Sequence, residues 1–353
     1  MRDLAPHRID VHAHHIAPAY RQALADAELW MPGGIPLPEW SPELALAFMD
    51  AHGIAVQLLS VSDPGVDFAP SAGRAALAGE CNDYAASVRE AHPTRFGALA
   101  VLALSDVGAA VTEAVRSLDE LQLDGVGLLS SCEGAYPGDP RFEPLLAELD
   151  ARASWVFVHP TTPGEGRMPS YATPSFVSEF PFDTTRAIIS LAFNGCFERF
   201  PRIRWHFAHG GGTVPMLWTR LRALGASAAE FGAALGLPDG SGALGPESVP
   251  DALARSFYDT ALVADEPALA ALSAMASPAQ IVFGSDWPFA ARLYPERGEP
   301  QPALARFGDE ERAAIERDTA LAQFPALAAR LGSPSAAGVL PGAEPADLQS
   351  TGR

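Results

Sequence analysis

The stretch Ile-Asp-Val-His-Ala-His, residues 9–14, is an apolar run that ends in two histidines, and the chain contains three similar runs. Residues 155–160 are Trp-Val-Phe-Val-His-Pro, residues 205–212 are Trp-His-Phe-Ala-His-Gly-Gly-Gly, and residues 281–288 are Ile-Val-Phe-Gly-Ser-Asp-Trp-Pro. Each run has the length and the β-branched or aromatic content of a buried strand. We interpret the four runs as β-strands whose C-terminal ends carry side chains that bind metals.

The rest of the chain continues this alternation of strands and helices. The expected strands lie at about 8–14, 54–61, 96–103, 125–130, 155–159, 203–209, 256–261 and 280–286. The expected helices lie at about 42–52, 74–91, 107–121, 142–152, 184–199, 213–235, 266–276 and 309–331, with Asp183 as one N-cap. Eight such units predict an α/β fold, the (β/α)8 TIM barrel. The rival, a doubly wound sheet, usually has a glycine-rich phosphate turn after its first strand, where this chain has histidines.

Two long loops are expected, one after the first strand and one after the fifth. They span residues 15–40 and 160–182 and contain several aromatic side chains. In a barrel such loops lie over the C-terminal mouth, where active sites form. We therefore expect Trp30, Tyr171 and Phe176 to contact a substrate.

The composition limits the classes of function that need to be considered. The chain has 24 basic and 43 acidic residues and a net charge of −19, which argues against nucleic acids and anionic membranes as partners. Three scattered cysteines and the lack of a visible secretory signal or long apolar run favour a cytoplasmic protein. We expect one barrel domain over residues 1–332 and a flexible tail over residues 333–353, which are rich in Ser, Pro, Gly and Ala.

The strand ends predict one metal site. His12 and His14 share a face of the first strand because side chains alternate with a period of two. His159 and Asp286 occupy the matching ends of the fifth and eighth strands. Three imidazoles and one carboxylate favour Zn²⁺, with Mn²⁺ or Fe²⁺ as alternatives, and no organic cofactor is expected. Taken alone, Asp286 also suits a turn or a helix cap.

His209 is predicted to be an acid or base that does not bind the metal. An imidazole has a reference pKa near neutrality, which suits proton transfer. Asp286 is the second catalytic candidate. His206 precedes His209 by three residues, so it is expected to face the helices outside the barrel.

These segments resemble the amidohydrolase-related metal-dependent decarboxylases, the family of aminocarboxymuconate semialdehyde, resorcylate, salicylate and 6-methylsalicylate decarboxylases. The matching stretches are residues 9–14, 156–160, 180–186, 197–201, 207–212, 256–261 and 281–289. The resemblance implies a (β/α)8 barrel with one divalent ion, bound at the four positions named above, and His209 as the catalytic histidine. It also implies a homodimer in which Arg220 reaches the carboxylate of a substrate in the partner's site.

The resemblance narrows the expected substrate to a small aromatic carboxylate. The helix at 42–52 has no arginine where the semialdehyde decarboxylase has one, and the first loop is more similar to the 6-methylsalicylate branch. We therefore expect non-oxidative decarboxylation of an aromatic hydroxy acid. The metal would bind its carboxylate and ortho hydroxyl, and Asp286 or His209 would deliver a proton to the ring. The alternatives are a hydrolase of a lactone, amide or imide that uses a metal-activated water, and a non-catalytic binding barrel.

Overall fold

Eight parallel strands form the centre of the molecule, in the order β1 to β8 along the sheet. The computed structural model describes residues 6–163, 173–223 and 248–332. The strands are β1 (Arg8–His14), β2 (Ile54–Ser60), β3 (Phe96–Val101), β4 (Gly125–Leu129), β5 (Trp155–His159), β6 (Arg204–Phe207), β7 (Phe257–Asp259) and β8 (Ile281–Val282). The Val11 amide donates to the Phe283 carbonyl at 3.0 Å, and Ala13 bridges Trp287 in parallel, so the sheet closes into a TIM barrel.

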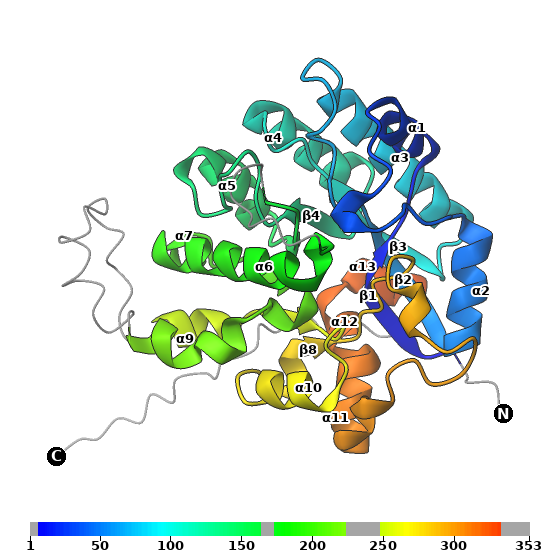
Figure 1. The fold of residues 1–353 in the computed structure, drawn as a ribbon, viewed down its shortest axis with the longest axis vertical. Coiled ribbons are helices and arrows are strands. Elements are labelled where there is room, and N and C mark those ends of the chain that lie inside the picture. Colours follow the sequence, from blue (N-terminus) through cyan, green and yellow to red (C-terminus); the bar gives the residue numbers. More distant parts are fainter. Residues whose placement is uncertain (1–5, 164–172, 224–247, 333–353) are drawn as a thin grey trace.

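Helices surround this barrel (Figure 1). The α-helices with defined bounds are α1 (Pro18–Asp26), α2 (Pro42–His52), α3 (Arg74–Ala91), α4 (Val107–Val115), α5 (Glu143–Ala151), α6 (Ser175–Phe193), α7 (Cys196–Arg199), α9 (Ser248–Leu253), α10 (Glu266–Ser273), α11 (Asp309–Ala313), α12 (Thr319–Gln323) and α13 (Pro325–Arg330). Residues 214–223 are also helical. The shorter helical segments are the 3-10 helices η1 (Pro32–Gly34), η3 (Pro140–Phe142), η4 (His209–Gly211), η5 (Pro278–Gln280), η6 (Ala291–Leu293) and η7 (Pro302–Arg306) and the π-helices η2 (Arg116–Glu120) and η8 (Ala314–Asp318).

The interior of the barrel is a packed apolar core that is closed at its N-terminal end. Side chains from the strands, including Val56 and Trp155, form one buried cluster with Phe324 and Leu327. The rings of Trp155 and Phe324 lie 4.8 Å apart. Residues 319–330 therefore cover the bottom of the barrel, and the opposite end carries the strand termini with the polar side chains.

The eight expected strands are confirmed, but the start of α6 differs from the prediction. This helix begins at Ser175, so the second half of the predicted loop at 160–182 is helical. Pro181 lies inside α6, where proline normally removes a backbone hydrogen bond. Its carbonyl accepts a hydrogen bond from the Thr185 hydroxyl at 2.7 Å. The predicted N-cap, Asp183, is instead a buried residue of the helix interior that accepts a hydrogen bond from Tyr136 at 2.8 Å.

The predicted first loop contains local structure. Helix α1 and the turn η1 lie within residues 15–40, and Pro18 is the first residue of α1, where proline suits a helix. Helix α2 follows and is capped by Ser41, whose hydroxyl accepts from the Leu44 amide at 3.2 Å. The remaining loop segments lie at the C-terminal ends of the strands.

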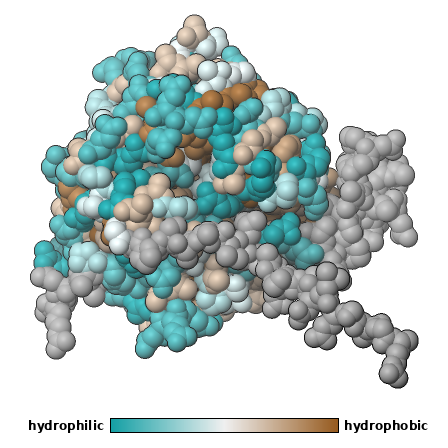
Figure 2. Space-filling view, turned by 180° about the vertical axis from the view of Figure 1, so that it is seen from behind, coloured by the Kyte–Doolittle hydropathy of each residue, from teal (hydrophilic) through white to brown (hydrophobic). Residues whose placement is uncertain are grey.

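The face of the molecule drawn in Figure 2 is largely hydrophilic. On the face shown in Figure 2, hydrophobic residues form small groups separated by hydrophilic ones. No helix within the described ranges is both long and apolar enough to cross a membrane. The predicted tail at 333–353 lies outside the described residues.

Candidate metal centre

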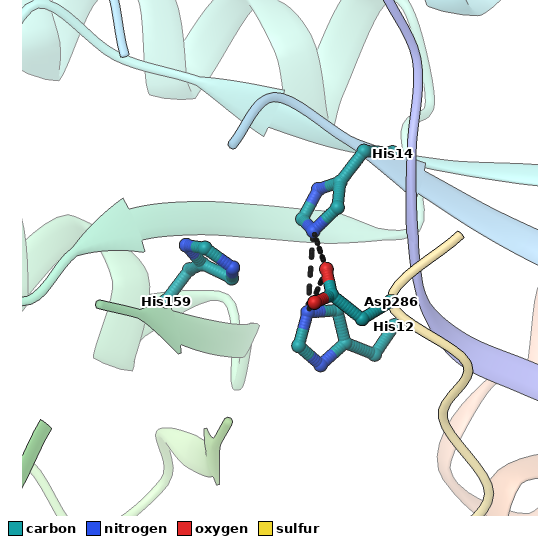
Figure 3. A group of neighbouring side chains, drawn as sticks. All are labelled: His12, His14, His159 and Asp286. Carbon is teal, nitrogen blue, oxygen red and sulfur yellow. Dashed lines mark hydrogen bonds and ion pairs between the residues drawn. The ribbon is translucent and has the colours of Figure 1, made fainter. Parts of the chain in front are cut away.

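Three histidines and one aspartate converge at the C-terminal end of the barrel, as the sequence predicts (Figure 3). His12 and His14 come from β1, His159 ends β5, and Asp286 follows β8. All four are buried, and each offers one ligand atom within 4.8 Å of the others. The His14 Nε2 atom lies 3.2 Å from the His12 Nε2 atom and 3.0 Å from an Asp286 carboxylate oxygen.

Hydrogen bonds fix the orientation of the three imidazoles. Their Nδ1 atoms lie 2.9 Å from an oxygen of Asp259 for His12, 2.9 Å from the hydroxyl of Ser60 for His14, and 2.8 Å from the carbonyl of Pro160 for His159. A carboxylate or a carbonyl only accepts hydrogen bonds, so Nδ1 carries the proton in His12 and His159. The Ser60 hydroxyl donates to the Ala13 carbonyl, so it accepts from His14. The three Nε2 lone pairs are therefore available to a metal.

The ligand atoms of His12, His14 and Asp286 are spaced as they would be around a divalent ion. Bonds of about 2.0–2.1 Å around a tetrahedral ion place neighbouring ligand atoms about 3.3–3.4 Å apart. His12 Nε2 lies 3.4 Å from the Asp286 oxygen and 3.2 Å from His14 Nε2, close to this separation. The donor set of imidazoles and one carboxylate suits Zn²⁺, Mn²⁺ or Fe²⁺.

The Asp286 carboxylate is in the form that binds cations. Burial raises the pKa of Asp286, but the adjacent His12 and His14 imidazoles outweigh this effect and hold the pKa well below its usual value. Its backbone has a φ of 54°, and its amide donates to the His12 carbonyl at 2.7 Å. The turn after β8 is thus tied directly to β1, which places the carboxylate beside both histidines.

Asp259, at the end of β7, is a member of the site that the sequence analysis missed. One of its oxygens accepts from His12 Nδ1 and from His206 Nε2, both at 2.9 Å. The other accepts from the amides of His209 and Ala261, both at 3.0 Å. Burial raises the pKa of Asp259, but the charge and hydrogen bond of His12 outweigh it and leave the pKa below its usual value. An aspartate at the end of an apolar strand was the available signal in the sequence.

The predicted orientation of His206 is wrong. Its ring lies inside the barrel, where it stacks on Phe157 with centroids 4.5 Å apart. The prediction extended the alternation of β6 through His209, but the strand ends at Phe207. His209 then adopts a left-handed φ of 54°, so its side chain and that of His206 both point into the barrel.

His209 reaches the site without occupying one of the four ligand positions. Its Nε2 atom lies 3.7 Å from the second Asp286 oxygen, and this buried atom has no hydrogen-bond partner among the described residues. The backbone after it approaches α6 closely, because a Cβ at Gly212 would lie 2.2 Å from the Pro181 carbonyl oxygen. The imidazole is therefore placed beside the centre with a ring nitrogen free to exchange a proton.

A cavity of about 280 Å³ opens at this centre. This volume is at the lower end of the range for small-molecule sites. Its wall is largely apolar and includes Ile35, Phe176, Phe180, Phe289 and Leu293. Its polar lining includes Asp63, His159, Asp286 and Arg292. The cavity suits a small, largely apolar molecule that also carries polar groups.

Of the four residues predicted to contact a substrate, only one is shown to line the cavity. Phe176 lines the cavity. Trp30 is 61% exposed and lines a separate surface hollow beside α1. Arg220 is exposed on the helix at 214–223 and is not part of the cavity lining of its own chain. Tyr171 lies outside the described residues.

Comparisons with known proteins agree with this architecture. The amidohydrolase family model matches residues 9–326. A 6-methylsalicylic acid decarboxylase of Aspergillus aculeatus is 35% identical over 91% of this chain and 96% of its own length. A crystal structure of an amidohydrolase II is 28% identical, covers 90% of this chain and 99% of that chain, and superposes with a TM-score of 0.78.

A more distant structure contains a metal. It is a 5-carboxyvanillate decarboxylase of Novosphingobium aromaticivorans in complex with manganese and 4-hydroxy-3-methoxy-5-nitrobenzoic acid. It is 19% identical over 92% of this chain and 99% of that chain, with a TM-score of 0.71, so it supports the fold alone. The matches over nearly the whole barrel show that this chain belongs to the amidohydrolase family, among its decarboxylases, which are carboxy-lyases.

Proposed function

We propose that the protein is a metal-dependent, non-oxidative decarboxylase of a small aromatic hydroxy acid of the 6-methylsalicylate, salicylate or resorcylate type. The observation that carries this proposal is the small apolar cavity that opens on three histidines and an aspartate. The named relative from Aspergillus aculeatus supports 6-methylsalicylate as the first substrate to test.

Binding and orientation of the acid follow from the cavity. Phe176, Phe180 and Phe289 provide apolar surface for an aromatic ring, and His159 and Asp286 bring the metal centre to the cavity wall. A divalent ion, for which we propose Zn²⁺, would be held by the four residues of the centre and would bind and neutralise the oxygens of the carboxylate and ortho hydroxyl. Exclusion of water by the apolar wall strengthens these electrostatic interactions.

We propose that His209 supplies the proton that replaces the carboxylate. The bond between the ring and the carboxylate breaks, its electron pair stays with the ring carbon, and carbon dioxide leaves without charge. The Nε2 atom of His209 gives its proton to that carbon. Asp286 is the weaker candidate because its lowered pKa leaves it without a proton near neutral pH. Asp259 holds the backbone of His209 in place through the 3.0 Å hydrogen bond.

The assembly that we propose is a homodimer in which Arg220 enters the partner's site. Several large apolar side chains are exposed near this helix: Val177 at 58%, Phe182 at 46% and Met216 at 78%. The Thr185 and Thr213 hydroxyls lie 2.8 Å apart, so α6 and the helix at 214–223 adjoin each other. Burial of these side chains against a second copy would stabilise such a dimer.

We further propose the cytoplasm as its compartment. Cys81, Cys132 and Cys196 are all buried free thiols, which suits a reducing environment.

The experiment that tests the activity uses a panel of acids. Protein loaded with zinc or manganese is incubated with 6-methylsalicylate, salicylate and 2,6-dihydroxybenzoate, and the release of carbon dioxide and of the phenol is measured. Lactones and amides are tested in parallel by release of acid. We expect carbon dioxide release from at least one hydroxybenzoate. Hydrolysis of a lactone or amide without any decarboxylation would reject the proposal.

A further inference from the structure

One arginine that lines the cavity has no hydrogen-bond or ion-pair partner among the described residues. Among the described lining residues, Arg292 alone carries a permanent positive charge. Its side chain forms no hydrogen bond or ion pair with any residue in the described ranges. The other charged lining residue outside the metal centre, Asp63, is engaged by Thr161 and by the Thr162 amide at 2.9 Å. An arginine without a partner among the described residues therefore lines the space where the substrate is proposed to bind.

The backbone that carries Arg292 is well fixed. It lies in η6, six residues after Asp286 on the same turn. The Ala290 amide donates to the Asp286 carbonyl at 2.9 Å, and the Leu293 amide donates to the Ala290 carbonyl at 2.9 Å. The Tyr294 hydroxyl donates to the Ser285 carbonyl at 2.7 Å, which ties both ends of the turn together. The guanidinium is thus presented from a constrained turn that begins at the metal centre.

We propose that Arg292 is the specificity residue that binds the carboxylate of the substrate within its own chain. This inference rests on the proposed decarboxylase function. A planar guanidinium pairs well with a carboxylate, and the pair is favoured where the surrounding wall is apolar. In a chain of net charge −19, it also gives an anionic substrate a local positive group. The ligand class is an aromatic monocarboxylate, and a neutral aromatic amide of the same shape would gain nothing from Arg292.

The chemistry of decarboxylation gives this pairing a kinetic signature. The negative charge of the carboxylate disappears as carbon dioxide leaves, so a guanidinium that pairs with it stabilises the bound acid more than the transition state. An interaction of this kind lowers KM without raising kcat. The phenol product has no carboxylate, so Arg292 does not retain it. Loss of Arg292 should therefore raise KM while kcat stays the same or increases.

The test compares three variants of the metal-loaded protein. Arg292→Gln removes the charge, Arg292→Lys keeps it, and Arg202→Gln is the control. Arg202 has a side chain that is 59% exposed and precedes β6, at the opposite end of the barrel. For 6-methylsalicylate we expect Arg292→Gln to raise KM about tenfold, the lower end of the usual effect of a charged hydrogen bond because Arg292 is exposed. Arg292→Lys should recover part of this loss, and Arg202→Gln should match the wild type.

The neutral compounds 6-methylsalicylamide and m-cresol serve as probes, and their competitive inhibition constants are measured. Their inhibition constants should be unchanged in Arg292→Gln. An unchanged KM for the acid, or an equal loss for the amide, would overturn the inference. A loss seen in Arg220→Gln and not in Arg292→Gln would also overturn it and assign the carboxylate to the partner's arginine.

Failure of the proposed function gives a different result. If the wild type releases no carbon dioxide from 6-methylsalicylate, the dissociation constant of the acid is measured by calorimetry and compared between the variants in place of KM. Binding that depends on Arg292 would then keep the inference and reject the decarboxylase. Absence of binding to the wild type would overturn both.

Discussion

Replacing Asp259 by asparagine should weaken metal binding, although Asp259 is not one of the four ligands. Its carboxylate receives hydrogen bonds from His12 and His206 on one oxygen and from two backbone amides on the other. An asparagine has one carbonyl oxygen, so its NH₂ group must face either two imidazole donors or two amide donors. In each orientation donors oppose donors, and in the orientation where the NH₂ group faces the imidazoles, His12 loses the acceptor that fixes its Nδ1 proton.

The size of the effect follows from the position of this hydrogen bond. Loss of a carboxylate that orients a ligating histidine typically weakens metal affinity about 10- to 100-fold. That range corresponds to about 1.4–2.7 kcal/mol of binding free energy. Since His209 shares the carboxylate through its backbone amide, turnover of the fully loaded variant should fall as well.

The assay is competition for Zn²⁺ with a chromophoric chelator, read as a dissociation constant, together with thermal unfolding of the metal-free protein. Asp124→Asn is the control, because the Asp124 carboxylate is also buried; it accepts from the Ala98 amide at 3.0 Å and pairs with Arg330 at 3.2 Å, away from the metal centre. We expect both variants to lose stability and Asp259→Asn alone to lose affinity for zinc. A wild-type dissociation constant in Asp259→Asn would refute the reasoning.

Three further predictions concern single residues or pairs. His209→Asn should retain the metal, measured by elemental analysis, and lose about two to four decades of kcat, the usual contribution of a positioned acid or base; wild-type turnover would remove His209 from the mechanism. A mixture of His12→Ala and Arg220→Ala chains should regain activity through heterodimers, and no recovery after demonstrated chain exchange would reject shared sites. Burial raises the pKa of Glu316, but a hydrogen bond from His7 and the charge of Arg8 outweigh it and set the pKa to about 2, against 4.5 for a free glutamate. A lowered folded-state pKa contributes stability above pH 4.5 that is lost as the pH falls toward 2, so Glu316→Gln should reduce the urea midpoint at pH 7 more than at pH 3; equal losses at both values would contradict this.

The strands and the predicted ligands were accessible to sequence analysis because their signals are local. An apolar run that ends in His159 or Asp286 is visible within six residues. The start of α6 was missed because Pro181 is a local argument against a helix, while the packing of Asp183 against Tyr136 depends on distant residues. Tertiary contacts decide such cases over local preference.

The remaining parts of the site depend on partners that are far apart in the sequence. Asp259 joins His12 and His206 across 247 and 53 residues. The orientation of His206 could not be derived from alternation, because the backbone leaves the strand before His209. Arg292 was not predicted for a related reason: its place in the cavity depends on the turn after β8, which no periodic pattern describes.

Apolar side chains close the N-terminal end of the barrel, so the active-site cavity opens only at the C-terminal end of the described structure. Trp155, Phe324 and Leu327 fill the end that lies away from the metal centre, so in the described part of the chain the base offers no passage. If the proposed function holds, the acid, the phenol and carbon dioxide would all pass through the cavity that Phe176 and Leu293 line. Phenol product and acid substrate would occupy the same cavity, so bound phenol would prevent the next acid from binding. Product should therefore inhibit competitively, and widening the rim should speed release before it alters the chemical step.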